Sequence, residues 1–283
     1  MKKLLFPVSL SFIAILLVPS VAFAAKPVGG GGAPKPTPTV EYVGYDVSYP
    51  QCGKRLPTDH YFGIVGVNGG TAASYNSCLT QQLIWAKNAK TDSNSKQPKV
   101  QLYVNTANPA QDAAYNWNNW PTNGSTPYGD CTGVRNNSTA CSWQYGWNRS
   151  VETEAYFISK AQAAGISSNT SDYTWWLDVE TMNSWQPANG LAQNRAAIEG
   201  FAAYYQSRSE NVGLYSTKTQ WEQIVGTTLI TEGNLVGLPN WRPSGASLAN
   251  AKANCSVNSL TSGGYIALTQ YVAKNLDHNH SCI

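Results

Sequence analysis

The sequence predicts an α/β fold in which about eight strands close into a TIM-like barrel. Segments rich in β-branched and aromatic residues alternate with segments of helical periodicity, which indicates a mainly parallel sheet with helical crossovers. Roughly eight strands in a chain of 283 residues favour a closed barrel. An open doubly wound sheet is the alternative, but it usually has a glycine-rich phosphate loop, and none follows the first strand here.

The N-terminal residues predict secretion. Lys2 and Lys3 precede an apolar run over residues 4–21, and Ala22-Phe23-Ala24 has the small-x-small pattern of a cleavage site. We expect a signal peptide over 1–24, with an uncleaved anchor as the alternative. Residues 25–39 contain a run of glycines and then spaced prolines, which predicts a linker. The folded domain is expected over 40–283, and the protein is expected to be extracellular without stable membrane insertion.

The composition argues against nucleic acid as a partner. The net charge of the whole chain is only +3, two of the lysines leave with the predicted signal peptide, and no dense basic cluster remains. Charged residues make up 12% of the chain, whereas aromatic and neutral polar residues are abundant. Aromatic faces and amides suit sugar binding, although a polar extracellular surface has the same composition.

The first half of the mature chain predicts three strands and two helices. Residues 62–68 are almost continuously apolar, which is typical of a strand buried on both faces. Apolar residues at helical spacing predict the first helix, and Gly165 marks the end of the second. The segments are, in order, strand 41–48, strand 62–68, helix 74–90, strand 100–105, loop 106–149 and helix 151–165.

The second half predicts five more strands, but helical periodicity fades after residue 225. The later strands are therefore expected to be joined by loops rich in Ser, Asn and Gly. The segments are strand 173–181, helix 191–208, strand 212–216, helix 218–225, strands 235–241 and 265–272, and a short last strand around Leu276.

Six cysteines in an exported chain predict disulfides. Six cysteines allow fifteen pairings, and we expect neighbours in sequence to pair: Cys52 with Cys78, Cys131 with Cys141, and Cys255 with Cys282. The second pair lies in the long loop after the third strand, and favours an ordered insertion there. No metal-binding cysteine or histidine spacing and no Gly-x-Ser-x-Gly nucleophile elbow is found, so neither a metal nor another cofactor is expected.

The strand over 173–181 carries two carboxylates on one face. Side chains alternate with period two, so Trp176, Asp178 and Glu180 should point the same way. Asp46 occupies a matching place near the end of the first strand. In a closed barrel the C-terminal ends of the strands meet at one mouth, where catalytic groups lie.

These acids have the chemistry that glycoside hydrolysis needs. The Cα atoms of Asp178 and Glu180 should lie about 6.5 Å apart along the strand. Close carboxylates do not ionise together easily, so one can stay protonated as a general acid. We assign that role to Glu180, and expect Asp178 and Asp46 to stabilise positive charge, attack, or activate water. A salt-bridged pair at the rim is the structural alternative. The candidate aromatic sugar platforms are Tyr103 and Trp176, with Trp241 as a more ambiguous one.

The chain resembles the glycoside hydrolase family 25 lysozymes, which are N-acetylmuramidases. The matching motifs are Gly44-Tyr45-Asp46-Val47-Ser48, Leu177-Asp178-Val179-Glu180, Leu214-Tyr215-Ser216, Gln270-Tyr271 and Leu276-Asp277-His278-Asn279. The resemblance implies a barrel with five β/α units followed by three strands without intervening helices. It also implies that Asp178 and Glu180 are the catalytic pair, that Asp277 reaches the site, and that Tyr215, Gln270 and the residue at Asn105 line the substrate groove.

Two strand ends differ from the family pattern. Asn68 stands where a glutamate motif is common, and Tyr103-Val104-Asn105 stands where Tyr-His is common. The first functional hypothesis is a secreted hydrolase of β-1,4 bonds in cell-wall glycan, with peptidoglycan as the expected substrate and partner. The alternative is a catalytically inactive barrel that binds wall polysaccharide. A chitinase-like enzyme is a third option, but the Asp-x-x-Asp-x-Asp-x-Glu run of that class is absent.

Overall fold

The computed structural model describes residues 41–109, 120–133 and 136–283. The predicted signal peptide over 1–24 and the linker over 25–39 lie outside the described residues. In the described part, no helix is both long and apolar enough to cross a membrane.

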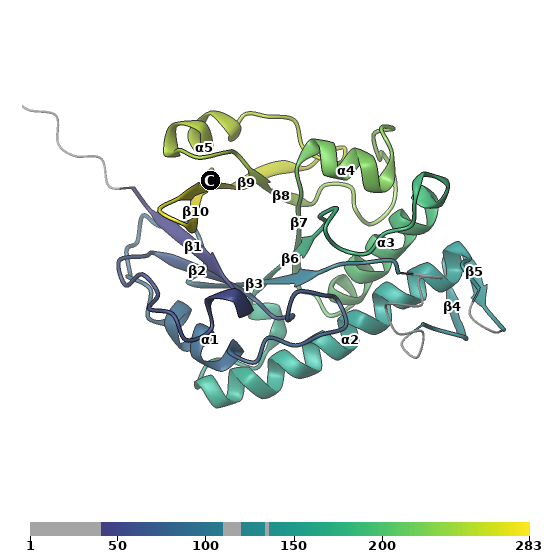
Figure 1. Cartoon of the computed structure of the whole chain (residues 1–283), viewed down its shortest axis with the longest axis horizontal. Helices are drawn as coiled ribbons and strands as arrows, with labels where there is room; N and C mark the ends of the chain where they lie inside the picture. The colour runs from purple at the N-terminus through teal and green to yellow at the C-terminus, as the bar shows by residue number, and fades with distance from the viewer. Residues whose placement is uncertain (1–40, 110–119, 134–135) are drawn as a thin grey trace, which may run out of the picture. The chain divides into compact units, whose positions relative to one another are not determined.

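Eight strands form a closed barrel, which confirms the predicted fold class (Figure 1). Around the barrel the order is β1-β10-β9-β8-β7-β6-β3-β2. The strands are β1 (Val43–Val47), β2 (Phe62–Gly66), β3 (Val100–Asn105), β6 (Thr174–Asp178), β7 (Asn211–Tyr215), β8 (Pro239–Pro243), β9 (Tyr265–Ala273) and β10 (Leu276–Ser281).

The last strand runs against the others. Neighbouring strands from β1 through β9 pair in parallel, whereas β10 is antiparallel to both β9 and β1. A reversed strand brings its beginning, rather than its end, to the mouth of the barrel. Asp277, near the start of β10, therefore lies opposite Asp46, near the end of β1.

Five α-helices accompany the described strands, but they are distributed differently from the prediction. The first strand is followed only by the short 3-10 helix η1 (Tyr49–Gln51), and an α-helix follows each of the next five barrel strands. The predicted absence of a helix after residue 225 is thus wrong for one short segment between β8 and β9. The helices are α1 (Leu79–Lys87), α2 (Thr139–Ala164), α3 (Leu191–Ser207), α4 (Lys218–Val225) and α5 (Leu248–Asn254).

Helix α2 starts twelve residues earlier than the sequence pattern predicts, which shortens the loop over 106–149. Ser138 caps the helix, because its side chain accepts a hydrogen bond from the backbone N–H of Cys141. The Cys131–Cys141 disulfide ties this first turn to a two-stranded ribbon, seen beside α2 in Figure 1. The inserted disulfide-bearing region is confirmed, and consists of β4 (Gly124–Thr126), β5 (Gly129–Cys131) and the start of α2.

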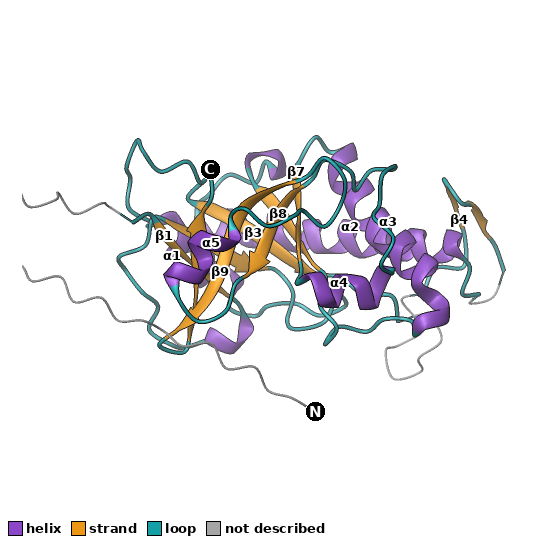
Figure 2. Cartoon of the chain, turned by 90° about the horizontal axis from the view of Figure 1, so that it is seen from above, coloured by secondary structure: helices purple, strands orange, loops and turns teal. Residues whose placement is uncertain are grey.

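Helices α2 and α3 pack closely along one side of the barrel, where both are seen in Figure 2. Gly200 makes this approach possible, because a Cβ atom there would lie 2.0 Å from the carbonyl oxygen of Trp143. Gly146 on α2 faces the backbone of Ala197 in the same way, at 2.1 Å. The glycine pair therefore sets the distance between the two helices.

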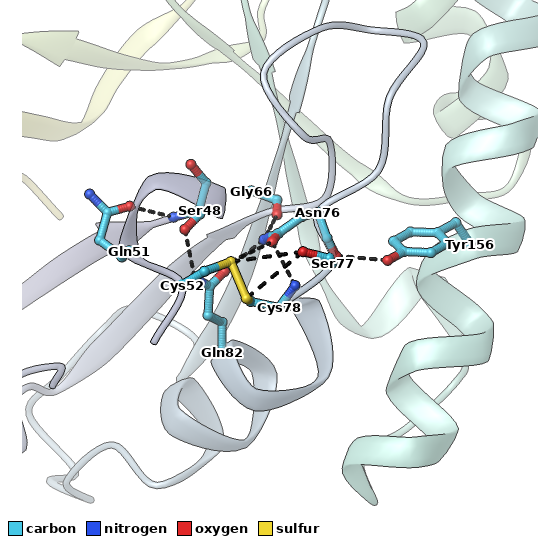
Figure 3. The surroundings of a disulfide bond; sticks show 9 residues. All are labelled: Ser48, Gln51, Cys52, Gly66, Asn76, Ser77, Cys78, Gln82 and Tyr156. Atoms are coloured by element: carbon cyan, nitrogen blue, oxygen red, sulfur yellow. Dashed lines mark hydrogen bonds between the residues drawn. A yellow bond between two sulfur atoms is a disulfide. The ribbon is translucent and has the colours of Figure 1, made fainter. Parts of the chain in front are cut away.

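All three predicted disulfides are confirmed, and one of them lies beside the mouth of the barrel. Cys52–Cys78 joins the segment after η1 to the start of α1 (Figure 3). Next to it, the Gln82 amide donates to the carbonyl oxygen of Ser48 at 2.6 Å, and the Asn76 amide donates to Gln82 at 2.7 Å. Both amides are buried. The disulfide and these amides hold the chain that follows β1.

Removing Cys52–Cys78 by serine substitution should reduce both stability and any activity at the mouth. The bridge spans 26 residues, and the chain-entropy estimate for such a loop is about 3.5 kcal/mol of unfolding free energy. Denaturant titration measures this change. The matched control is removal of Cys255–Cys282, which spans 27 residues at the other end of β10. It should cost similar stability and leave kcat/KM of the folded protein unchanged. Equal loss of kcat/KM in both variants would contradict the positioning role.

A buried acidic pair, Glu154 on α2 and Glu210 just before β7, lies outside the lining of the barrel mouth. Glu154 accepts hydrogen bonds from Thr170 at 2.8 Å and from Tyr204, whereas neither carboxylate oxygen of Glu210 has a partner of good geometry. Burial, together with the nearby Glu154, raises the pKa of Glu210 to about 8, although Thr170 and Arg208 oppose the shift. Glu210 is therefore protonated in the folded protein at neutral pH.

Replacing Glu210 with Gln should stabilise the fold at alkaline pH. An acid with a raised pKa in the folded state holds its proton more tightly than in the unfolded chain, so its contribution to stability falls as the pH rises from 4.5 to about 8. The stability gained in Glu210→Gln should grow across this window and vanish below about pH 4. Unfolding curves at several pH values test this. The exposed Glu232→Gln control should show no such trend, and a pH-independent gain at position 210 would contradict the interpretation.

Candidate active site

A cavity of about 290 Å³ opens at the mouth of the barrel. Strand ends and the segments that follow them supply its walls, which is the usual place for a site in a barrel of this kind. The lining includes both acidic side chains and neutral polar and aromatic groups. It comprises Asp46, Val47, Ser48, Tyr49, Pro50, Gln51, Gly70, Tyr103, Asn105, Asp178, Glu180, Met182, Asn183, Tyr215, Trp241, Gln270 and Asp277.

Asp46 is held by two amides. Its Oδ2 atom accepts hydrogen bonds from Gln270 at 3.0 Å and from Asn279 at 2.7 Å. Burial and the charge of Asp277 raise the pKa of Asp46 to about 8, and the two amide hydrogen bonds lower it. The carboxylate is thus fixed in orientation, and a negative charge on Asp277 opposes its ionisation.

The two amides also connect Asp46 to the aromatic wall. The Tyr215 hydroxyl donates to Gln270 at 2.8 Å, and the Trp241 indole N–H donates to Asn279 at 2.7 Å. Each amide therefore has its oxygen occupied by an aromatic donor, which leaves its NH₂ group to face Asp46. This arrangement presents hydrogen-bond donors to the acid and stabilises its charged form.

Asp178 is buried at the end of β6, and its Oδ1 atom has no hydrogen-bond partner. Burial is the main reason that the pKa of Asp178 is raised, and the charges of Glu180 and Asp46 add to the shift. The backbone carbonyl of Asp178 is fixed by the Thr106 hydroxyl at 2.6 Å and by the Asn183 amide at 3.2 Å. A buried carboxylate oxygen without a partner is costly, and its position in the cavity makes Asp178 a candidate functional residue.

Glu180 lies two residues beyond Asp178 and is half-buried at the rim. Strand β6 ends at Asp178, so Glu180 belongs to the following segment rather than to the strand, where the sequence pattern had placed it. Burial raises the pKa of Glu180, a hydrogen bond with Gln220 opposes the shift, and the charge of Asp277 adds to it. Burial also raises the pKa of Asp277 itself, while His278 lowers it.

The four acids form one electrostatic unit. Each carboxyl group is shifted upward by burial, and the shifts of Asp46, Asp178 and Glu180 also include a neighbouring acid. Four carboxylates in one small cavity oppose one another's ionisation, so their titrations are coupled. Such a set can hold a proton on one acid while another is ionised, which is the combination that acid–base chemistry requires.

Of the two amides at the altered strand ends, Asn105 lines the cavity, whereas Asn68 is buried and contacts the backbone of Asn105. Asn68 is buried, and its Oδ1 atom accepts a hydrogen bond from the backbone N–H of Asn105 at 2.8 Å. The Asn105 side chain lines the cavity and donates to Asn183 at 3.3 Å. Asn68 fixes the end of β3, whereas Asn105 presents a neutral amide to the cavity.

Most of the predicted site residues lie together, with one exception. Trp176 is wrong as a sugar platform, because it is only 1% exposed and packs inside the barrel with its indole N–H bonded to Gln101 at 2.8 Å. Large side chains fill the interior of a barrel, and this position lies one layer below the mouth. Trp241 lines the cavity but is only 2% exposed. The cavity also contains the other predicted residues: Asp46, Asp178, Glu180, Asp277, Tyr103, Asn105, Tyr215 and Gln270.

Two residues on the rim of the cavity carry no signal in the sequence. Tyr49 and Met182 line the cavity and are 47% and 84% exposed, so they offer accessible apolar surface at its entrance. Both lie on segments that follow a strand, where no periodic pattern reveals them. The place of Asn279 at the site could be predicted from the sequence, because it lies two residues from Asp277 on the same face of β10. In the described part of the chain, no group of three His, Cys, Asp or Glu residues is arranged to hold a metal ion.

A family model described as lysozyme-like protein 1 matches residues 142–253. The matched segment is less than half of the chain, runs from α2 into α5, and includes Asp178 and Glu180. The resemblance to lysozymes inferred from the sequence motifs is thus confirmed over this segment. No curated protein matches the chain.

Two solved structures are similar to this chain. One is the modular Cpl-1 endolysin complexed with a peptidoglycan analogue, at 12% identity and a TM-score of 0.43, covering 86% of this chain and 55% of that chain. The other is a muramidase from Trichobolus zukalii, at 14% identity and a TM-score of 0.46, covering 84% of this chain and 92% of that chain. The chain therefore spans about half the length of the endolysin.

Proposed function

We propose that the protein is a glycoside hydrolase that cleaves β-1,4 bonds of cell-wall glycan, with peptidoglycan as its substrate. The observation that carries this proposal is the convergence of Asp46, Asp178, Glu180 and Asp277 on one cavity with raised pKa values. Such a set supplies both a proton for the leaving oxygen and negative charge for an oxocarbenium-like transition state. The lysozyme-like match over 142–253 supports the same substrate class.

Glu180 is proposed as the general acid. It lies at the rim, where the glycosidic oxygen of a long glycan can approach it, and its raised pKa keeps it protonated at higher pH than an ordinary glutamate. Asp178 lies deeper, with one oxygen unpaired, and would face the positive charge that develops on the sugar ring. Asp46 is positioned by two amides to stabilise that charge from the other side, or to activate the attacking group.

The rest of the cavity fits a neutral sugar. Tyr103, Tyr215 and the rim residue Tyr49 offer aromatic surface, while Asn105 and Gln270 offer amides. Aromatic faces bury the apolar side of a pyranose ring, and amides pair with its hydroxyl and acetamido groups. These residues are proposed as the substrate-binding residues, together with Asp277 and the largely buried Trp241.

The rate should fall as the pH rises through the pKa of Glu180, because the deprotonated acid cannot protonate the leaving oxygen. The charge of Asp277 contributes to that raised pKa. Asp277→Asn should therefore move the falling limb of kcat/KM to lower pH. A pH profile on soluble glycan oligomers measures the limb. The exposed Asp59→Asn control should leave it in place, and an unmoved or upward-shifted limb in Asp277→Asn would contradict the assignment.

The direct test is incubation of the mature protein with purified cell walls. Falling turbidity together with new reducing ends, identified as muramic acid or glucosamine termini, is the expected result. The identity of the new terminus separates a muramidase from a glucosaminidase. Retention of the protein on the walls without any new reducing ends would overturn the proposal and favour the second candidate.

The second candidate is an inactive barrel that binds wall polysaccharide. The observation that favours it is the neutral amide of Asn105 in the cavity wall, next to the buried amide of Asn68, at two strand ends. A binding module needs the cavity and its amides, but not the raised pKa values of the acids. Binding that persists in variants lacking Glu180, without turnover in the parent protein, would identify this function.

We also propose that the protein is exported and that residues 1–24 are removed. Residues 25–39 are then a linker, and residues 40–283 are the domain that acts on the cell wall. Three disulfides in the described part support an oxidising compartment. Mass spectrometry of the protein recovered from culture medium gives the mature N-terminus.

A further inference from the structure

Arg242 lies on the opposite side of β8 from the candidate active site. Its neighbour Trp241 lines the catalytic cavity, whereas Arg242 lines a second cavity of about 200 Å³ on the outside of the barrel. Successive side chains of a strand point to opposite faces of the sheet, so these two adjacent residues line different cavities. The outer cavity lies among β8, helix α4, the 226–229 segment that follows it, and the 258–260 segment before β9.

The guanidinium of Arg242 is buried but incompletely paired. The residue is 8% exposed, its Nη1 atom donates to the carbonyl oxygen of Asn258 at 3.0 Å, and its Nε atom has no hydrogen-bond partner. Among the described residues it takes part in no ion pair, unlike Arg149, Arg195 and Arg208. Burial alone lowers its pKa, with no carboxylate contributing in the opposite direction.

A buried positive charge without a counter-charge is unfavourable, because desolvation is not offset by an ion pair. The one acid that lines the same cavity, Glu222, is ion-paired with Lys218 one helical turn away. This pair is neutral as a unit and leaves the charge of Arg242 uncompensated. The cavity therefore combines a fixed, incompletely paired cation in its wall with enough volume for a small group.

We propose that this outer cavity binds a small oxyanion, a phosphate or a carboxylate group, through Arg242. Planar guanidinium donors match the paired oxygens of such anions better than an ammonium group does. The side chains of Thr227 and Ser259 in the wall are neutral hydroxyls that an oxyanion tolerates. This site is separate from the acidic mouth, and does not depend on whether the mouth is catalytic.

The probes are inorganic phosphate and N-acetyl-D-alanine, each compared with sodium chloride at equal ionic strength. Either probe at ten times its Kd should raise Tm by roughly 3–6 °C, because a ligand that binds only the folded state stabilises it. Titration should also shift the NMR signal of the Arg242 Nε–H group. Arg242→Gln should lose the Tm response, and Arg55→Gln, the same change at an exposed position, should keep it.

Response to phosphate alone assigns the site to a phosphate-bearing ligand, and response to the carboxylate alone assigns it to a carboxyl terminus. Response to both assigns it to oxyanions in general. No Tm rise and no Nε–H shift with either probe would overturn the proposal, as would an equal response in Arg242→Gln. If Arg242→Gln fails to fold, the Nε–H titration of the parent protein and the Arg242→Lys variant still decide the question. The lysine should bind more weakly because it lacks the planar donor pair.

Discussion

Glu180→Gln should lower the rate of wall hydrolysis by about 10²–10⁴-fold, which is the contribution expected of a general acid. Glutamine keeps the size of the side chain but has no proton to transfer to the leaving oxygen. The position is half-buried at the rim, so the fold and the binding of glycan should both survive. The measurements are the release of reducing ends from purified walls and a separate pull-down of protein on the same walls.

Glu232→Gln is the matched control for that experiment, since Glu232 is exposed and lies outside the cavity. It should hydrolyse walls at the parental rate. A Glu180→Gln variant that is as active as the parent would show that another acid donates the proton. A variant that is inactive and also no longer retained on walls would instead point to a role of Glu180 in binding.

Asp178→Asn should reduce activity by about 10²–10³-fold while it stabilises the protein at neutral pH. Burial and neighbouring acids raise the pKa of Asp178 in the folded state. The ionised side chain therefore destabilises the folded protein. Asparagine removes the charge and keeps the shape. The stability gain should be present at pH 7 and should disappear near pH 3, where aspartate is protonated in the unfolded chain as well.

Thermal unfolding at both pH values measures the change in stability, and initial rates on walls measure the change in activity. Asp59→Asn, at an exposed position, should change neither stability nor rate. Loss of activity together with loss of stability in Asp178→Asn would mean that Asp178 is a structural residue. Increased stability with full activity would mean that the charge is not used in the reaction.

The strands that position the site were predictable, because their residue types and alternation are local properties. β3 and α4 have the boundaries that the pattern predicts, and the acids at the ends of β1 and β6 converge as expected for a barrel. The disulfides were predictable because each joins neighbouring cysteines. The burial of Trp176 inside the barrel was not predictable, because alternation indicates which face a side chain occupies but not how far below the mouth it lies.

Other differences have tertiary causes. Helix α2 begins at Thr139 because Ser138 and a disulfide fix its first turn. Helix α5 has only 7 residues, too few for a periodic pattern to be recognised. The reversed direction of β10 follows from its short connection to β9, and direction is not encoded in the composition of a strand. The charge state of the acidic mouth depends on burial, which the order of residues along the chain does not reveal.

The closure of the barrel by β10 bears on how the candidate active site forms during folding. Asp46 is fixed by Gln270 and Asn279, which are 224 and 233 positions away along the chain. Contacts this distant form slowly, because a large loop must close before they contribute any stability. The cavity therefore reaches its final geometry only after the two ends of the domain have come together, and we expect partly folded chains to carry the four acids without the arrangement proposed for catalysis.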